Sequence, residues 1–254
     1  MGKIIAFANQ KGGVGKTTSA INIAASLGVL GYKVLMIDLD PQGNATSGVG
    51  IMKRSLKVTA LDMLSNPDVG AEAVTLDTPY DNLRVIPSTT ALARAEVEMG
   101  EIENYEFVLK TKLEAVRDRY DYIIIDCPPS LGLLTVNALV ASDGVVIPMQ
   151  CEFFPLEGLS QLMITVSRIK THYNKALNVT GILITMYNNR LLLSAQVIQE
   201  LRKHYADKLF ETTISRNVKL SEAPSFGAPV YYHEKRSKGA VEYLNVAKEL
   251  AERI

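Results

Sequence analysis

The sequence alternates short, continuously apolar runs with longer stretches of helical character along its whole length. The apolar runs lack the polar alternation of a strand with one face in water, so each is predicted to be a strand covered on both sides. Strands that alternate with helices form right-handed βαβ units and a mostly parallel, twisted sheet. The expected strands are residues 3–8, 33–38, 83–87, 120–128, 143–150 and 178–187, and the expected helices are roughly residues 17–30, 90–118, 132–141, 156–173, 194–206 and 238–253.

We expect one α/β domain over residues 1–254, a three-layer α/β/α arrangement with helices on both faces of the sheet. Hydrophobic residues make up 47% of the chain, and no low-complexity linker or internal repeat divides it. Two cysteines give no disulfide framework, which favours a reducing, cytoplasmic setting. No apolar run is long enough to span a membrane, and the first is too short for a signal peptide, so we expect no membrane insertion.

Ligands of such sheets bind beyond the carboxyl ends of the strands. The polar residues that follow the predicted strands therefore mark the expected site. Five segments qualify: residues 9–18, 38–44, 126–130, 150–154 and 188–190.

The segment after the first strand, ANQKGGVGKTTSA at residues 8–20, has the composition of a phosphate-binding loop. Gly12, Gly13 and Gly15 leave room for backbone N–H groups to surround an anion, and the following helix directs its own unpaired N–H groups at the same place. Lys16 is expected to reach the β- and γ-phosphates, and the Thr17 hydroxyl to bind Mg²⁺. The loop predicts a nucleoside triphosphate site.

This loop departs from the usual pattern G-x-x-x-x-G-K-[ST]. Gln10 occupies the first glycine position, and a second lysine, Lys11, stands beside it. A dinucleotide-binding fingerprint is the nearest alternative, but it requires a third glycine where this chain has Thr18. The strand before the loop and the helix after it favour a P-loop NTPase-like fold.

Carboxylates follow two further strands. Asp38 and Asp40, in MIDLDPQGNATSG, leave the second strand on the same side because side chains alternate along a strand. A carboxylate beside a γ-phosphate accepts a hydrogen bond from the attacking water and orients it. Asp126, in IIIDCPPS, has the position of a Walker B acid, which holds Mg²⁺ directly or through water. The adjacent Cys127 is expected to be a small buried residue.

Together these segments resemble the ParA/MinD family of deviant Walker ATPases, whose variant loop K-G-G-x-x-K-[ST] corresponds to residues 11–17. The motifs QKGGVGKTT, DLDPQGNATSG, YDYIIIDCPPSLGLLT, QCE…LEGL and RNVKLSEAPSFG run along the chain in the family's order and look closest to short chromosomal ParA proteins of the Soj type. The resemblance implies ATP and Mg²⁺ as ligands, with nucleotide contacts from Lys11, Gly12, Gly13, Val14, Gly15, Lys16, Thr17 and Thr18.

The resemblance also implies residue roles. Lys11 matches the signature lysine that reaches the partner subunit's nucleotide, and Gly12 lies where two subunits meet, so an ATP-dependent homodimer is implied. Lys16 serves the subunit's own nucleotide, and Asp40 positions the hydrolytic water. The implied metal residues are Thr17, Asp38 and Asp126, and the implied adenine contacts are Met186, Asn188, Pro224 and Pro229.

Basic residues are concentrated late in the chain. Residues 168–238 carry a net charge of +7, although the whole chain is neutral, and such asymmetry is one signature of nucleic-acid binding. The resemblance implies DNA contacts from Arg190, Lys219 and Arg216. No helix-turn-helix precedes the first strand, so we expect non-specific, salt-sensitive binding to the phosphates of double-stranded DNA.

The implied function is an ATPase that partitions chromosomes or plasmids, is weakly active alone, and is stimulated by a ParB-like centromere-binding protein at the nucleoid. A MinD-like membrane-associated ATPase is the main alternative, but the terminal VEYLNVAKELAERI has mixed charge rather than the basic amphipathic pattern of a membrane-binding helix. An iron–sulfur reductase is disfavoured because Cys127 directly follows the Walker B acid. A scaffold without hydrolysis is disfavoured by the presence of Asp40.

Overall fold

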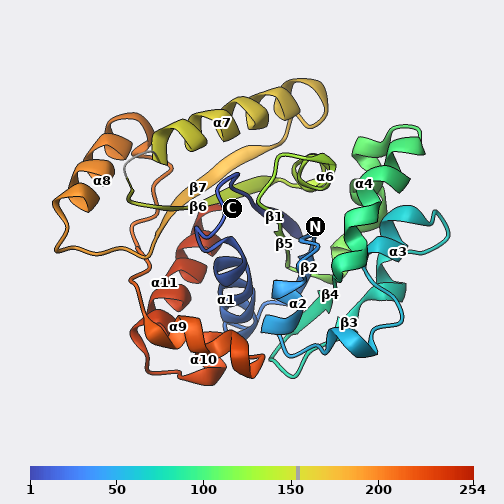
Figure 1. The fold of residues 1–254 in the computed structure, drawn as a ribbon, viewed down its shortest axis with the longest axis horizontal. Helices are drawn as coiled ribbons and strands as arrows, with labels where there is room; N and C mark the ends of the chain where they lie inside the picture. The colour runs from blue at the N-terminus through green and yellow to red at the C-terminus, as the bar shows by residue number, and fades with distance from the viewer. Residues whose placement is uncertain (153–154) are drawn as a thin grey trace.

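The computed structural model describes residues 1–152 and 155–254. Its central layer is a seven-stranded sheet in the order β3-β4-β2-β5-β1-β6-β7 (Figure 1). All neighbouring strands pair in parallel except β3 and β4, which are antiparallel. The strands are β1 (Lys3–Phe7), β2 (Val34–Asp38), β3 (Leu76–Asp77), β4 (Leu83–Ile86), β5 (Tyr122–Asp126), β6 (Gly144–Gln150) and β7 (Asn178–Thr185). The predicted mostly parallel α/β fold is confirmed.

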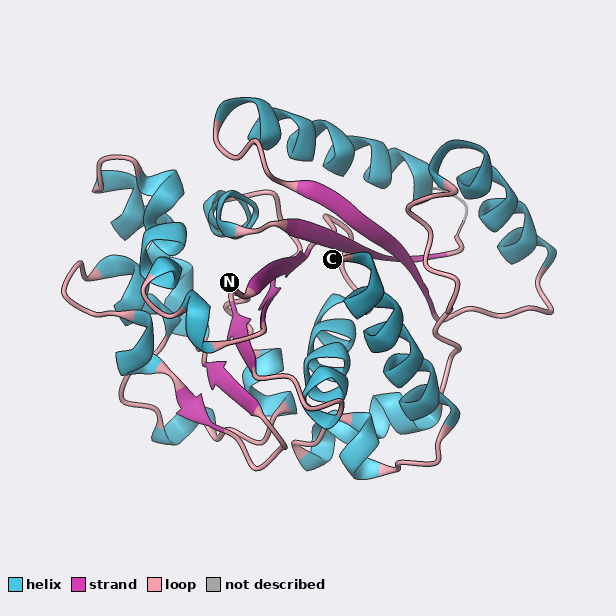
Figure 2. Cartoon of the chain, turned by 180° about the vertical axis from the view of Figure 1, so that it is seen from behind, coloured by secondary structure: helices cyan, strands magenta, loops and turns pink. Residues whose placement is uncertain are grey.

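Helices cover both faces of the sheet (Figure 2). One face carries α1 (Lys16–Val29), α2 (Asn44–Gly48), α9 (Val218–Glu222), α10 (Val230–His233) and α11 (Lys238–Arg253). The other carries α3 (Ala60–Ser65), α4 (Ala95–Glu98), α5 (Val108–Glu114), α6 (Leu133–Ala141), α7 (Pro155–His172) and α8 (Leu192–Tyr205).

Each central strand sends alternate side chains into two separate cores, as its continuous apolar sequence predicts. In β1, Ile5 and Phe7 pack into the core under α1 and α11. Ile4 and Ala6 pack into the core on the opposite face. The sheet is therefore buried on both faces. Polar groups gather instead where the strands begin and where they end.

Two expectations about the elements are wrong. The predicted helix over residues 90–118 is broken into α4, α5 and short 3₁₀ turns. Asn104 within it has a φ of 57°, a left-handed conformation that interrupts an α-helix, and Gly100 lies in one of the turns. The antiparallel strand β3 was not expected from the sequence, because two residues carry too short a pattern to recognise.

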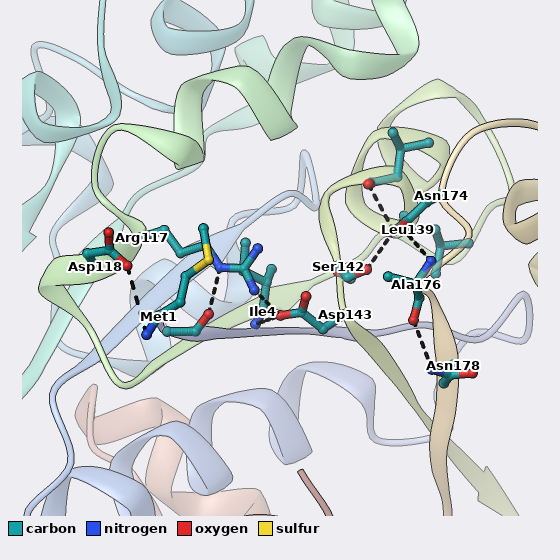
Figure 3. Close-up of polar contacts among 12 residues, drawn as sticks. Met1, Ile4, Arg117, Asp118, Leu139, Ser142, Asp143, Asn174, Ala176 and Asn178 are labelled. Carbon is teal, nitrogen blue, oxygen red and sulfur yellow. Dashed lines mark hydrogen bonds and ion pairs between the residues drawn. The ribbon is translucent and has the colours of Figure 1, made fainter.

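A charged cluster closes the edge at which the strands begin, here called the amino edge (Figure 3). Arg117 donates through Nε to the carbonyl oxygen of Gly2 at 2.7 Å and through a terminal nitrogen to Asp143 at 2.6 Å. The same Asp143 oxygen accepts a hydrogen bond from the backbone N–H of Ile4 at 2.8 Å. One ion pair thus joins the start of β1 to the connections before β5 and β6.

A second polar anchor at this edge is Asn174, which is buried. Its amide nitrogen lies within hydrogen-bond distance of the carbonyl oxygens of Leu139, Val140 and Ser142 (Figure 3). These carbonyls end α6, where helical carbonyls have no partner within the helix. The loop before β7 therefore caps the helix before β6.

Candidate nucleotide site

The loop between β1 and α1 lies beyond the carboxyl ends of the strands, here called the carboxyl edge. Gly13 and Gly15 have φ values of 74° and 82°, a left-handed region that strains any residue with a side chain. Gly15 is the N-cap of α1 and provides no side-chain cap, so the first N–H groups of that helix stay available to an anion.

Side chains from neighbouring strands hold this loop in place. Thr185 at the end of β7 donates to the carbonyl oxygen of Val14 at 2.8 Å. Gln150 at the end of β6 donates to the carbonyl oxygen of Gly13 at 2.7 Å. Asn9 donates to the carbonyl oxygen of Pro148 at 2.8 Å and accepts from the backbone N–H of Lys11. The anchoring by Thr185 and Asn9 was not expected, since Thr185 lies within the predicted strand 178–187 and Asn9 has the character of an ordinary polar residue after a strand.

The two lysines of the loop occupy different environments. Lys16 is 6% exposed, and its Nζ donates to the carbonyl oxygen of Lys11 at 3.1 Å, so its ammonium lies inside the loop. Burial lowers the pKa of Lys16, against the opposing effect of the nearby Asp126 charge. The Lys11 side chain is half exposed and forms an ion pair with Glu152. Lys16 faces its own loop, whereas Lys11 extends away from it.

Asp126 is fully buried at the end of β5, and neither of its carboxylate oxygens has a hydrogen-bond partner of normal geometry among the described residues. It pairs in register with Asp38 at the end of β2. Burial and the Asp38 charge raise the pKa of Asp126, and the nearby Thr17 hydroxyl only partly opposes this. The nearby Lys16 charge also opposes the shift only in part, so a further cation beside this carboxylate would be stabilised.

Asp38 is buried as well, but both of its oxygens are hydrogen-bonded. One accepts from the backbone N–H of Asp40 at 3.1 Å, and the other accepts from the N–H and hydroxyl of Thr46, both at 2.7 Å. Burial raises the pKa of Asp38 to about 6, although these hydrogen bonds lower it. Asp38 therefore holds the start of α2 and the loop before it, and its Oδ1, which accepts one hydrogen bond, keeps a lone pair that a metal ion or a metal-bound water could use.

Asp40 lies in that loop and is 8% exposed. One carboxylate oxygen accepts a hydrogen bond from the backbone N–H of Gln42 at 2.9 Å. The Asp40 carbonyl oxygen accepts from the hydroxyl of Ser88 at 2.8 Å, which ties the loop to the end of β4. Sequence analysis missed Ser88, since a single serine after a strand carries no recognisable signal.

The donor set at this edge fits Mg²⁺. The described residues contain no group of three or more His, Cys, Asp or Glu side chains arranged to hold a metal ion. Mg²⁺ does not require such a cage, because it commonly takes one or two protein oxygens, substrate phosphates and water. The Asp126 carboxylate has no hydrogen bond of normal geometry among the described residues and lies beside Thr17, so its oxygens can serve such an ion.

A cavity of about 460 Å³ opens beside the loop and has room for a nucleotide base and sugar. Its lining includes Gly15, Thr18, Met186 and Pro224. Met186 has a φ of 50°, a left-handed conformation unusual outside glycine, which turns the chain at the end of β7 into the cavity wall. Pro229 begins α10 and is not among the residues lining this cavity.

A second cavity, of about 780 Å³, adjoins the first and shares Met186, Ser215 and Arg216 with it. Asn188 lines this second cavity rather than the first. Two of the predicted DNA-contacting residues, Arg190 and Arg216, also line it, and both are exposed. Lys219 lies on α9 and lines neither cavity. The three cations therefore divide into a pair at one opening and a single lysine on the adjacent helix.

Residues 150–152, Cys127 and Gly12 also lie at the carboxyl edge. Of the segment 150–154, residues 153 and 154 lie outside the described residues. Cys127 is fully buried, and burial raises the pKa of its thiol, which suits a packing role. Gly12 has nothing within 4 Å of the position that a Cβ atom would occupy, so the loop is open to solvent there.

Comparison with known proteins places these features in a family. A family model described as an AAA domain matches residues 2–179. The chain is 53% identical to the sporulation initiation inhibitor protein Soj of Bacillus subtilis over 251 residues, which cover 99% of each chain. It is 47% identical to the chromosome partitioning protein ParA of Myxococcus xanthus, with 100% of this chain and 89% of the relative covered.

A solved structure matches the fold over 99% of this chain and 95% of its own. It is the cobyrinic acid a,c-diamide synthase of Mycobacterium smegmatis with a bound ATP analogue and magnesium, with a TM-score of 0.87 at 33% identity. None of the helices in the described part of the chain has the length and hydrophobicity that a membrane crossing requires.

Proposed function

Because this chain belongs to the ParA and Soj family of partition ATPases, we propose that it binds Mg²⁺ and ATP, dimerises on ATP, and moves DNA by binding it as the dimer. Identity to Soj and ParA, at 53% and 47%, exceeds the 33% identity to the diamide synthase, so partition is favoured over the latter's activity. Hydrolysis is weak in the protein alone and is stimulated by a ParB-like centromere-binding protein.

Within one subunit, the loop glycines and the first turn of α1 bind the phosphates, and Lys16 contacts the β- and γ-phosphate oxygens. Thr17 and Asp126 hold Mg²⁺, which neutralises negative charge on the phosphates. Asp40 has one carboxylate oxygen engaged by Gln42, and the other is available to accept a hydrogen bond from water. That geometry suits a residue that orients the attacking water.

The observation that carries the dimer proposal is the different orientation of the two loop lysines. Lys16 is buried in its own loop, while the Lys11 side chain is half exposed and, among the described residues, forms an ion pair with Glu152 alone. A half-exposed ion pair contributes little, about 0–1 kcal/mol, so Lys11 can leave it at small cost. In the dimer, Lys11 exchanges Glu152 for the phosphates of the partner subunit, much as an arginine finger completes a site in trans.

DNA binding follows from the basic residues beside the nucleotide cavities. Arg190 and Arg216 share one opening, and Lys219 lies on the adjacent α9. One subunit offers few phosphate contacts, so dimerisation doubles them and couples ATP to DNA affinity. This coupling places the ATP form on the nucleoid and releases it after hydrolysis.

A MinD-like membrane role is the second candidate and is less well supported. It needs a C-terminal amphipathic helix whose apolar face is free. Here the apolar side of α11, including Tyr243, Val246 and Leu250, is buried in the core shared with α1. Membrane attachment through this helix would expose that core.

Co-sedimentation with DNA and with liposomes, each with and without ATP, tests the proposal. We expect ATP-dependent retention on DNA and none on anionic liposomes. Retention on liposomes alone would favour the membrane role.

Two sets of variants sharpen the result. Replacing Arg190 and Lys219 together by Glu should abolish DNA retention, while dimerisation on ATP, measured by sedimentation velocity, persists. Asp40→Ala should trap an ATP-bound dimer that keeps its DNA affinity. An Asp40→Ala protein that no longer binds nucleotide would contradict the role given to Asp40.

A further inference from the structure

We propose that Glu222 restrains DNA binding by holding Lys219 in an ion pair that a DNA phosphate must break. This inference rests on the proposed function, since it concerns the regulation of the DNA-binding surface. Glu222 is then neither a catalytic residue nor a nucleotide ligand. The Glu222 carboxylate competes with a DNA phosphate for the Lys219 ammonium.

The pair is formed within one short helix. Lys219 Nζ lies 2.8 Å from Glu222 Oε2, three residues further along α9. Asn217 caps the start of this helix by accepting from the backbone N–H of Lys219 at 2.8 Å, which fixes the position of the lysine. The pair raises the pKa of Lys219 and lowers that of Glu222, so both groups are charged at neutral pH.

Glu222 also lies close to His233, whose Nε2 has no hydrogen-bond partner of normal geometry among the described residues. The same Oε2 lies 3.5 Å from His233 Nε2. The His233 ring stacks on Phe226, with ring centroids 4.9 Å apart, and its side chain is only 15% exposed. The carboxylate therefore lies between the Lys219 ammonium and a ring fixed by packing.

The opposite side of the same segment lines the nucleotide cavity. Val218, Leu220, Ser221 and Pro224 belong to the wall of the 460 Å³ cavity, whereas Lys219 and Glu222 do not. A base in this cavity would thus contact the helix that carries the ion pair. Through that contact, nucleotide binding can affect the position of α9 and therefore of Lys219, the lysine proposed to contact DNA.

The ion pair between Lys219 and Glu222 is weak enough for DNA phosphates to break it. Both side chains are more than 40% exposed, and ion pairs of this kind are weak in water. A dense row of phosphates can therefore displace the carboxylate, but it must approach a negative charge to do so. Removing that charge should strengthen binding to DNA, because Lys219 is then free to contact a phosphate.

The chain provides a matched control on α8. Glu200 pairs with Lys203 three residues later, at 2.7 Å, with 38% and 59% of the two side chains exposed. Glu200→Gln and Glu222→Gln remove the same charge from the same kind of pair. Only Glu222 has a partner among the three predicted DNA-contacting residues.

The test measures affinity for a non-specific DNA duplex by fluorescence anisotropy across a salt series, with Mg²⁺ and a slowly hydrolysed ATP analogue. Glu222→Gln should bind about threefold to tenfold more tightly, with a salt dependence steeper by about one to two counterions per dimer. Glu200→Gln should stay within about twofold of the wild type. In a Lys219→Ala background, Glu222→Gln should bring no gain.

Unchanged or weaker binding by Glu222→Gln would overturn the inference. So would an equal gain in Glu200→Gln, which would indicate a general charge effect, or a gain that survives Lys219→Ala. If the wild type and every variant lack nucleotide-dependent DNA binding, the proposed function itself fails. Melting temperature and nucleotide affinity, measured in parallel, show that each variant is folded.

Discussion

At the amino edge of the sheet, Arg117 and Asp143 pair with each other and with the first residues of β1. At the carboxyl edge, Asp126 is buried beside Asp38 and has no hydrogen-bond partner of normal geometry among the described residues. The same strands run between both edges, so the hydrophobic core they share does not explain the difference. At the amino edge the protein satisfies both charges of the pair, whereas at the carboxyl edge the Asp126 carboxylate has no such partner among the described residues.

The contrast separates what stabilises the fold from what binds a ligand. Buried charges without partners cost free energy, and folded proteins tolerate them mainly at functional sites. Lys16 is desolvated in its loop, and Asp126 is desolvated at the end of β5. In a Mg²⁺–ATP complex the phosphates would interact with the Lys16 ammonium, and the Mg²⁺ with the Asp126 carboxylate. Changes at the carboxyl edge should therefore impair binding and spare stability, and changes at the amino edge should do the reverse.

The largest effect is expected at the loop. Lys16→Ala should weaken ATP binding by about 100-fold or more, because it removes a desolvated cation from the phosphates. Lys3→Ala, at the exposed first residue of β1, is the matched control and should change affinity by less than about twofold. Equilibrium binding of a fluorescent ATP analogue measures both. A similar loss in the two variants would remove the distinction between the edges.

A large loss of stability is expected at the amino edge. Asp143→Ala leaves Arg117 and the backbone N–H of Ile4 without their shared acceptor, at a cost of about 3 kcal/mol in the free energy of unfolding. Urea unfolding followed by circular dichroism measures this. ATP affinity at 15 °C, where the variant stays folded, should remain within about twofold of the wild type. A variant with wild-type stability would show that this pair does not secure the edge.

A smaller and opposite effect is expected at Asp126. A buried carboxylate with a raised pKa keeps its proton more readily in the folded state, so the wild type binds more protons folded than unfolded as the pH rises from about 4 through the raised pKa of Asp126. Its stability without nucleotide should therefore fall as pH rises through this range. Asp126→Asn removes the repulsion with Asp38 and should raise the free energy of unfolding at pH 7.5 by about 1–2 kcal/mol.

Urea unfolding of the two proteins at pH 5.0 and pH 7.5, without Mg²⁺ or nucleotide, checks this prediction. The advantage of Asp126→Asn should shrink at pH 5.0, because the raised pKa lets the wild-type Asp126 keep its proton more readily in the folded state as the pH falls. A variant less stable than the wild type at pH 7.5 would mean that the carboxylate is satisfied in a way the structure does not show.

The sequence predicted the fold and a glycine-rich loop between the first strand and the first helix, because both depend on local signals. Apolar runs, glycines and the acids after strands can be recognised without knowing what they contact. The broken helix around Asn104 was missed, since a left-handed residue leaves no distinct periodicity. The partners of Lys11 and of the loop carbonyls, Glu152 and Thr185, are more than 100 residues away in sequence, so only the folded sheet reveals them.

The assignments around the base depended on distant contacts in the same way. Met186 and Pro224 line the cavity beside the loop, but Asn188 lines its neighbour, and Pro229 is not among the residues lining either. Residues near one another in sequence diverge there because the chain turns sharply at Met186. A motif can place such a segment near the nucleotide without specifying which of its residues face it.

The central claim is that the carboxyl edge leaves Asp126 available for the magnesium that accompanies ATP. Calorimetric titration of ATP with Mg²⁺ and with EDTA, in the wild type, Asp126→Asn and Asp143→Ala, tests it most directly. The account predicts that Mg²⁺ tightens binding by about tenfold or more in the wild type and in Asp143→Ala, and by less than about twofold in Asp126→Asn. An Asp126→Asn protein that retains the full effect of Mg²⁺ would contradict it.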